Sequence, residues 1–190
     1  NTSNASLTTP HSFSFTTKNA SMTTPFFTKG IIELGGGTSY SVFAVDIDGD
    51  DDMDIVSASI GKIKWFESDG ASDPSWTAND IDTGVSLAHS VFASDIDGDG
   101  DMDIVSASMS DNTIAWYEND GSQQFTKHAL PYLAGALWLD GADLDNDGDF
   151  DLMAAGQNSP CLYWFENDGE QNFTRWPVEG NFSSAFCVIP

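Results

Sequence analysis

From about residue 40 onward, short apolar runs of strand length alternate with polar turns rich in aspartate and glycine. The run IVSAS at residues 104–108 combines β-branched and small residues, which suit the pleated surface of a half-buried strand. Similar runs stand at residues 55–59 (IVSAS) and 152–156 (LMAAG). Each is followed by an aromatic segment (KWFESDG, AWYENDG or YWFENDG) and then by WTANDI, FTKHAL or FTRWPV. The recurrence of the same segments, in the same order and at a nearly constant spacing, indicates a repeat architecture. The pattern predicts an all-β fold with three repeats of four strands, at about residues 40–83, 88–130 and 136–178.

Incomplete repeats are predicted at both ends of this array. FTKGII at residues 27–32 resembles the outer strand FTKHAL, and SAFCVI at residues 184–189 resembles the inner strand SVFAVD. Each of these two segments is therefore expected to be a single strand without the rest of its repeat. We divide the chain accordingly into an extended N-terminal segment, residues 1–26, and a repeat domain, residues 27–190.

Residues 1–26 are rich in Ser, Thr and Asn and contain a small repeat of their own, NASLTTP followed by NASMTTP. This composition is typical of a disordered, glycosylated leader. Phe13 and Phe15, however, alternate with serine in the manner of a strand. The second interpretation is that the segment is a donor strand that pairs with a neighbouring protomer.

A nine-residue acidic segment precedes each small-residue strand, at residues 46–54, 95–103 and 143–151. Carboxylates this close together repel one another strongly unless a counter-charge lies between them. Aspartates at alternate positions of a tight loop, together with a backbone carbonyl at the seventh position, supply the oxygens that Ca²⁺ prefers, whereas Mg²⁺ keeps more of its waters. Strand residues follow where an EF-hand would have a helix, so this is a different loop. We predict about three Ca²⁺ ions, one per loop, at Asp46, Asp48, Asp50, Asp52, Asp54, Asp95, Asp97, Asp99, Asp101, Asp103, Asp143, Asp145, Asp147, Asp149 and Asp151.

These repeats resemble the FG-GAP/VCBS family, whose units are four-stranded blades of β-propellers such as the integrin α-subunit head. The resemblance covers roughly residues 40–178 and is carried by the three correctly spaced aspartate loops. It implies Ca²⁺ in the loop between the first two strands of each blade. One departure is Asp51, which stands where the other loops have Gly100 and Gly148. Because that position calls for a positive φ, we expect the first site to be weaker or differently bent.

The net charge of −24 argues against nucleic acid and anionic membranes as partners. No apolar stretch approaches the roughly 20 residues that a membrane-spanning helix needs. Five N-glycosylation sequons favour a eukaryotic secretory route and an extracellular location. They lie at Asn1, Asn4, Asn19, Asn172 and Asn181.

Cys161 and Cys187 are the only cysteines, and in an oxidising compartment they are predicted to form a disulfide. The alternative is a pair of buried free thiols. No nucleophile elbow or phosphate-binding glycine loop is present, and the three histidines match no zinc spacing. We therefore expect that the protein is not an enzyme.

Trp65, Trp116 and Trp164 occupy one repeated position. An aromatic residue that recurs once per repeat predicts packing between repeats, and the alternative is a set of platforms that stack on sugars. Trp138 and Trp176 break the repeat and are candidates for a surface contact.

Propellers close with about four to eight blades, and three blades leave apolar faces and sheet edges open. We therefore predict a secreted structural subunit whose copies join head to tail into a filament or ring, through open blade edges and the N-terminal segment. The alternative is an extracellular carbohydrate-binding or adhesion module whose partner is a glycan or another protein. A third interpretation is that the chain is part of a longer propeller.

Overall fold

The structure is a computed structural model that describes residues 38–159 and 162–178 of the chain. These residues form strands and turns without a helix, as the sequence pattern predicts. Some predictions concern residues outside the described ranges. They are the extended segment 1–26, the strands at 27–32 and 184–189, the sequons at Asn1, Asn4, Asn19 and Asn181, and the Cys161–Cys187 disulfide.

Three four-stranded antiparallel sheets follow one another along the chain, and we call them the first, second and third blade. In each sheet the strands lie in sequence order, so every neighbouring pair is a simple hairpin. The first blade contains β1 (Ser39–Val45), β2 (Asp54–Ser59), β3 (Gly61–Ser68) and β4 (Trp76–Val85). The second contains β5 (Ala88–Ser94), β6 (Asp103–Ser108), β7 (Thr113–Asn119) and β8 (Phe125–Ala129). The third contains β9 (Ala136–Ala142), β10 (Asp151–Gly156), β11 (Leu162–Asn167) and β12 (Phe173–Val178).

The same strand register recurs in the first two blades, because the same residues recur in sequence. Val42 on β1 pairs with Ser57, and Val91 on β5 pairs with Ser106. Both inner hairpins also contain an irregularity near the start of the first strand. Alternate residues of each strand point to opposite faces of the sheet, so each blade presents one face to each neighbour.

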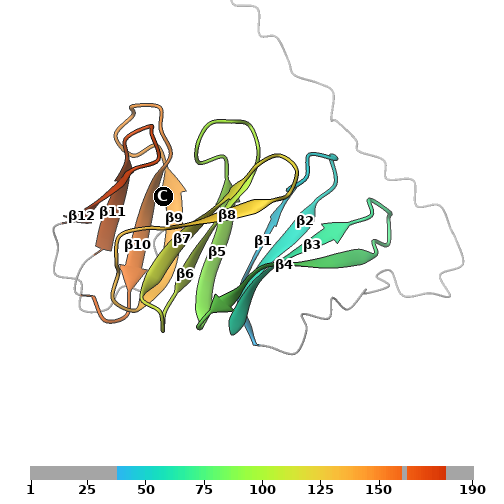
Figure 1. Ribbon diagram of the computed structural model, residues 1–190, viewed down its shortest axis with the longest axis horizontal. Coiled ribbons are helices and arrows are strands. Elements are labelled where there is room, and N and C mark those ends of the chain that lie inside the picture. Colours follow the sequence, from blue (N-terminus) through green and yellow to red (C-terminus); the bar gives the residue numbers. More distant parts are fainter. Residues whose placement is uncertain (1–37, 160–161, 179–190) are drawn as a thin grey trace, which may run out of the picture.

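The blades stack side by side, with β1 against β5 and β5 against β9 (Figure 1). We call the contact between the first and second blades the first interface, and that between the second and third blades the second interface. Each interface encloses its own apolar core. The first interface buries Ile47, Val56, Ala58, Ile63, Trp65, Val85, Ala88, Val91, Ala93, Ile104, Ala115 and Tyr117. The second buries Phe92, Ile96, Val105, Ala107, Ile114, Trp116, Leu130, Leu133, Ala136, Leu139, Leu152, Ala154 and Phe165.

The recurring tryptophans occupy the third strand of each blade. Trp65 belongs to the first core and is 5% exposed, and Trp116 belongs to the second and is 3% exposed. The predicted packing role is therefore confirmed for these two residues. Trp164 lies at the same position on the third blade and is only half-buried. Trp176, predicted as a surface residue, is 48% exposed on β12.

Candidate metal centres

The three aspartate loops connect the first and second strands of each blade, where the sequence resemblance placed them. We number the loop positions 1 to 9 from the first aspartate, so the loops are residues 46–54, 95–103 and 143–151. All three lie at the same end of the blade stack, since they join equivalent strands (Figure 1).

The carboxylate of the position-1 aspartate accepts hydrogen bonds from backbone N–H groups later in its own loop, and the loop therefore bends around it. Asp95 accepts hydrogen bonds from the backbone N–H of Gly98 (2.8 Å) and of Gly100 (3.1 Å). Asp46 accepts from Gly49 (2.8 Å) and Asp51 (2.9 Å) in the same way. Donation by several backbone amides fixes the orientation of the carboxylate within the loop. In the third loop Asp143 accepts from Asp147 and Gly148.

Position 6 has a positive φ in all three loops, as predicted. The angle is +72° at Asp51, +99° at Gly100 and +102° at Gly148. The backbone N–H of Asp51 nevertheless donates to Oδ2 of the position-1 aspartate, as those of Gly100 and Gly148 do, so the first loop follows the same course. Aspartate in this conformation carries a strain that glycine lacks. Sequence reasoning missed a second left-handed position, position 4, which is occupied by Gly49, Gly98 and Asn146.

The position-9 aspartate is buried in every loop and ties the loop to the third strand. Asp103 is fully buried and accepts from the backbone N–H of Ile96 (3.1 Å) and of Asn119 (2.8 Å). Burial raises the pKa of Asp103 to about 6, although these hydrogen bonds lower it in part. Asp54 makes the equivalent bonds to Ile47 and Ser68, and Asp151 makes them to Leu144 and Asn167. Both oxygens of this side chain therefore accept hydrogen bonds from backbone N–H groups.

Carboxylate oxygens converge in each loop within reach of one cation. The grouped residues place ligand atoms within 4.8 Å of one another. In the first two loops they come from positions 1, 3 and 5, whereas in the third loop position 9 takes the place of position 5. The groups are Asp46, Asp48 and Asp50; Asp95, Asp97 and Asp99; and Asp143, Asp145 and Asp151.

The position-3 carboxylate shows the strongest sign of a missing partner. Oδ1 of Asp48 is buried and receives no hydrogen bond from the described part of the chain. Burial, together with neighbouring carboxylates, raises the pKa of Asp48, Asp97 and Asp145 above the usual range. An all-oxygen donor set of clustered carboxylates fits a hard cation such as Ca²⁺.

Position 7 lies apart from these groups. Asp52, Asp101 and Asp149 place their carboxylates against Gly70, Gly121 and Gly169, respectively, at the turn between the third and fourth strands. A side chain on any of these glycines would collide with the carboxylate. The position-7 side chain therefore packs against the Asp-Gly turn that ends each aromatic segment.

Of the five predicted sequons, the one at Asn172 lies in the described part of the chain. The Asn172 side chain is exposed and donates to Asp168 in the β11–β12 turn of the third blade.

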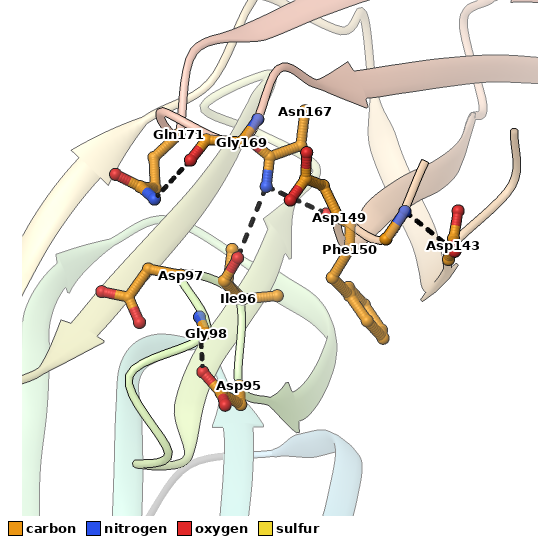
Figure 2. Close-up of a pocket in the computed structure, with 11 residues that line it drawn as sticks. Asp95, Ile96, Asp97, Gly98, Asp143, Asp149, Phe150, Asn167, Gly169 and Gln171 are labelled. Carbon is orange, nitrogen blue, oxygen red and sulfur yellow. Dashed lines mark hydrogen bonds between the residues drawn. The ribbon is translucent and has the colours of Figure 1, made fainter. Parts of the chain in front are cut away.

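Sequence reasoning missed an asparagine that joins neighbouring loops. Nδ2 of Asn119 donates to the carbonyl of Ile47 (3.3 Å) in the preceding blade and of Met102 (3.2 Å) in its own. Asn167 likewise donates to Ile96 (3.4 Å) and Phe150 (3.3 Å), beside a pocket of about 240 Å³ (Figure 2). The signal was present in the sequence, because the second and third repeats read END where the first reads ESD.

Comparison with known families agrees with this geometry. A family model described as FG-GAP-like repeat matches residues 46–106 and 95–154, which together span more than half of the chain. The chain belongs to the FG-GAP-like repeat family. Each match begins at a position-1 aspartate, so the family unit runs from one aspartate loop into the next. No curated protein matches the chain.

FG-GAP-like repeats are typical of extracellular, adhesion-type modules. The all-β fold of this FG-GAP-like chain, with its four-stranded blades, agrees with that membership. Within residues 38–159 and 162–178, no helix has the length and apolar character needed to cross a membrane.

Proposed function

We propose that this FG-GAP-like chain is a secreted, calcium-binding structural module whose copies join head to tail. The observation that carries the calcium part is the convergence of carboxylates in all three loops, with a buried, unpartnered oxygen on Asp48. Such an oxygen is costly to bury unless a cation or a donor meets it. One ion per loop gives about three Ca²⁺ ions per chain.

The role of the loops is structural. Bound Ca²⁺ would supply the positive charge that offsets the repulsion among the clustered carboxylates. The chain itself sets the frame: Asp95 curls the second loop, and Asp103 fastens it to β6 and β7. Asn119 then connects this loop to the first one across the first interface. A cation that rigidifies one loop is therefore expected to stabilise the adjoining blade contact as well.

Self-assembly and secretion rest on different observations. Apolar side chains lie exposed on both outer blades, among them Val42 (61%) on β1 and Trp176 (48%) on β12. Exposed apolar side chains that lie close together are a feature of interaction sites. Family membership and the exposed sequon at Asn172 support an extracellular location.

A second candidate function is carbohydrate binding. A polar pocket of about 550 Å³ lies beside the first loop, between the third and fourth strands of the first blade and the β7–β8 turn. Asn79, Gln123 and Gln124 contribute amide groups to it, and Phe125 contributes an aromatic wall. Amides and aromatics together are suited to sugar hydroxyls and ring faces. Saturable binding of isolated protomers to a glycan array would support this candidate, and an array without binding would exclude the sugars tested.

Calcium titration by calorimetry, combined with thermal unfolding in Ca²⁺ and in excess EDTA, tests the main proposal. At a hundredfold excess over Kd, each site adds about 2.7 kcal/mol to the unfolding free energy. We expect Asp97→Asn to remove one of the sites and to lower the midpoint only in Ca²⁺. Asp73→Asn is the matched control, since it makes the same charge change at an exposed position outside the loops. Equal midpoints in Ca²⁺ and EDTA, with no heat of binding, would show that the loops hold no calcium.

A further inference from the structure

The first blade exposes the positions that the second blade buries against it. Val42 on β1 is 61% exposed, whereas Val91, its counterpart on β5, is 4% exposed in the first interface. Met53 is 57% exposed, whereas its counterpart Met102 packs against the core of that interface. The sequence pattern is the same, and within the described residues no blade packs against this face of the first blade.

The third blade shows the complementary feature on its opposite face. Trp176 on β12 is 48% exposed and occupies the place of His128, which stacks on Trp116 with ring centroids 4.5 Å apart. Val178 is 40% exposed, whereas its counterpart Leu130 is 8% exposed in the second core. The outer face of the third blade thus corresponds, position by position, to the face of the second blade that packs against the third blade.

We propose that the outer face of the third blade receives the first blade of a second copy, in the arrangement of the two interfaces inside the chain. This proposal rests on the self-assembly part of the proposed function and specifies its contact. One chain carries both halves of such a contact: Val42 and Met53 on one end of the stack, and Trp176 and Val178 on the other. A head-to-tail contact of this type is heterologous, so each copy that joins leaves its own other face free to bind a further copy.

Charge complementarity also favours a second copy. On the first blade, Lys64 stands at the position that Ala115 occupies in the first core. Together with Lys62 it pairs with Asp80, so these two lysines and one aspartate carry one net positive charge. On the third blade, Asp140 stands at the position of Phe92, and it points away from the second core because its neighbour Leu139 packs into that core. The two outer faces therefore carry opposite charges at positions where the interior faces carry apolar side chains, and opposite charges on mating surfaces favour association.

One element of the interior interfaces is absent from the proposed contact. Asn119 and Asn167 each donate to the loop of the preceding blade, but the corresponding residue of the first blade is Ser68. Serine is too short to reach the carbonyl of Leu144 in a preceding copy as asparagine reaches Ile47. The contact between copies is therefore weaker than the contacts within a chain, and it should depend on protein concentration.

This difference allows a test in which one variant gains affinity. Sedimentation of the full 190-residue chain in Ca²⁺, over a range of concentrations, gives the association constant. We expect Val42→Glu to weaken association at least tenfold, and Ser68→Asn to strengthen it about fivefold by restoring one hydrogen bond. Ser68→Asn keeps a side-chain acceptor for the next turn, since Ser68 accepts from Gly70 as Asn167 does from Gly169. Ile60→Glu is the control, because Ile60 is 53% exposed in the β2–β3 turn, outside both faces.

A mixing experiment identifies the occupant. Val42→Glu blocks the outer face of the first blade and Trp176→Glu blocks that of the third, so neither variant alone should assemble. Mixed together, they should form heterodimers and nothing larger. A wild-type monomer that still binds Ca²⁺ would overturn this contact and the self-assembly proposal, and it would leave the calcium sites in place. Assembly that is unchanged by Val42→Glu, but lost on deletion of residues 1–26, would overturn this contact alone.

Discussion

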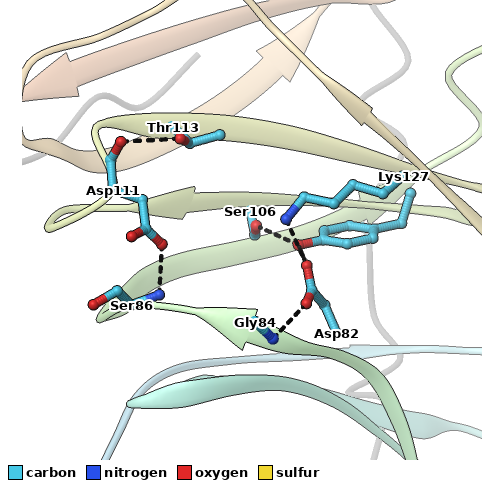
Figure 3. A network of polar contacts seen from close by, with 8 residues as sticks. Asp82, Gly84, Ser86, Ser106, Asp111, Thr113 and Lys127 are labelled. Carbon is cyan, nitrogen blue, oxygen red and sulfur yellow. Dashed lines mark hydrogen bonds and ion pairs between the residues drawn. The ribbon is translucent and has the colours of Figure 1, made fainter.

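The two interfaces inside the chain have the same geometry and different chemistry. At the first interface Tyr117, with Ser106 and Lys127 beside it on the second blade, faces Asp82 of the first blade (Figure 3). The positions of Tyr117 and Ser106 are occupied in the third blade by Phe165 and Ala154. Pro131 stands where a counterpart of Asp82 would lie. The difference shows that the stacking of blades requires the shape of these side chains and tolerates a change in their polarity.

The polar network of the first interface is fully connected. The hydroxyl of Tyr117 donates to Asp82 Oδ2 (2.9 Å), Lys127 Nζ donates to the same oxygen (2.6 Å), and Gly84 N–H donates to Oδ1 (2.7 Å). Burial raises the pKa of Asp82, but these hydrogen bonds outweigh burial and hold that pKa below its usual value. A satisfied network fixes the alignment of two blades, whereas an apolar contact mainly adds stability.

The apolar interface is expected to be the more sensitive to truncation. Phe165 is fully buried in the second core, and Phe165→Ala should lower the free energy of unfolding by about 3–5 kcal/mol. Phe43→Ala is the control, since Phe43 is 36% exposed on the first blade and should cost about 1 kcal/mol or less. Urea unfolding measures both variants. Equal losses would mean that the buried position in the second core is no more sensitive to truncation than the exposed position on the first blade.

Removal of the central carboxylate should have a smaller effect at the first interface. Asp82→Ala leaves the buried Tyr117 hydroxyl without its acceptor, and we expect a loss of about 2 kcal/mol. Asp80→Ala is the matched control, because Asp80 pairs with Lys62 and Lys64 on the surface with 41% of its side chain exposed. An exposed pair of this kind contributes about 0–1 kcal/mol. If both variants unfold at the same urea concentration, the network adds nothing beyond a surface ion pair.

Acid should affect the first interface selectively. Because the pKa of Asp82 is lower in the folded chain than in the unfolded chain, its contribution is complete above the unfolded value of about 3.9 and declines as the pH falls through the folded value. The measured quantity is the difference in unfolding free energy between wild type and Asp82→Asn, which cancels the titration of the aspartate loops. We expect that difference to be constant near neutral pH and to shrink below about pH 4. A difference that grows on acidification would contradict the assigned direction.

The sequence predicted the fold and the location of the metal loops because both depend on local, repeated patterns. The spacing of Asp95, Asp97 and Asp99 and the strand residues after them are visible in the sequence. The different contacts made by the aspartates of one loop were not predictable, because they depend on burial. Asp103 accepts hydrogen bonds from backbone N–H groups, whereas Asp101 lies against a glycine of a distant turn. Contacts between blades, such as that of Asn119 with Ile47, join residues 72 positions apart, so the repeated asparagine is visible in the sequence but its partner is not.

The smallest expected effect comes from exchanging the chemistry of one interface for that of the other. Tyr117→Phe gives the first interface the residue type that Phe165 supplies to the second, and it keeps the buried ring. It removes one hydrogen bond to Asp82, which retains Lys127 and Gly84 as donors, so the expected loss is about 1 kcal/mol or less. A double-mutant cycle with Asp82→Ala measures the coupling between the two side chains. Because Tyr117 keeps only the long contact with Ser106 in the Asp82→Ala background, Tyr117→Phe should be close to neutral or stabilising there. The same loss in both backgrounds would show that Asp82 and Tyr117 act independently, and that this network does not couple the first two blades.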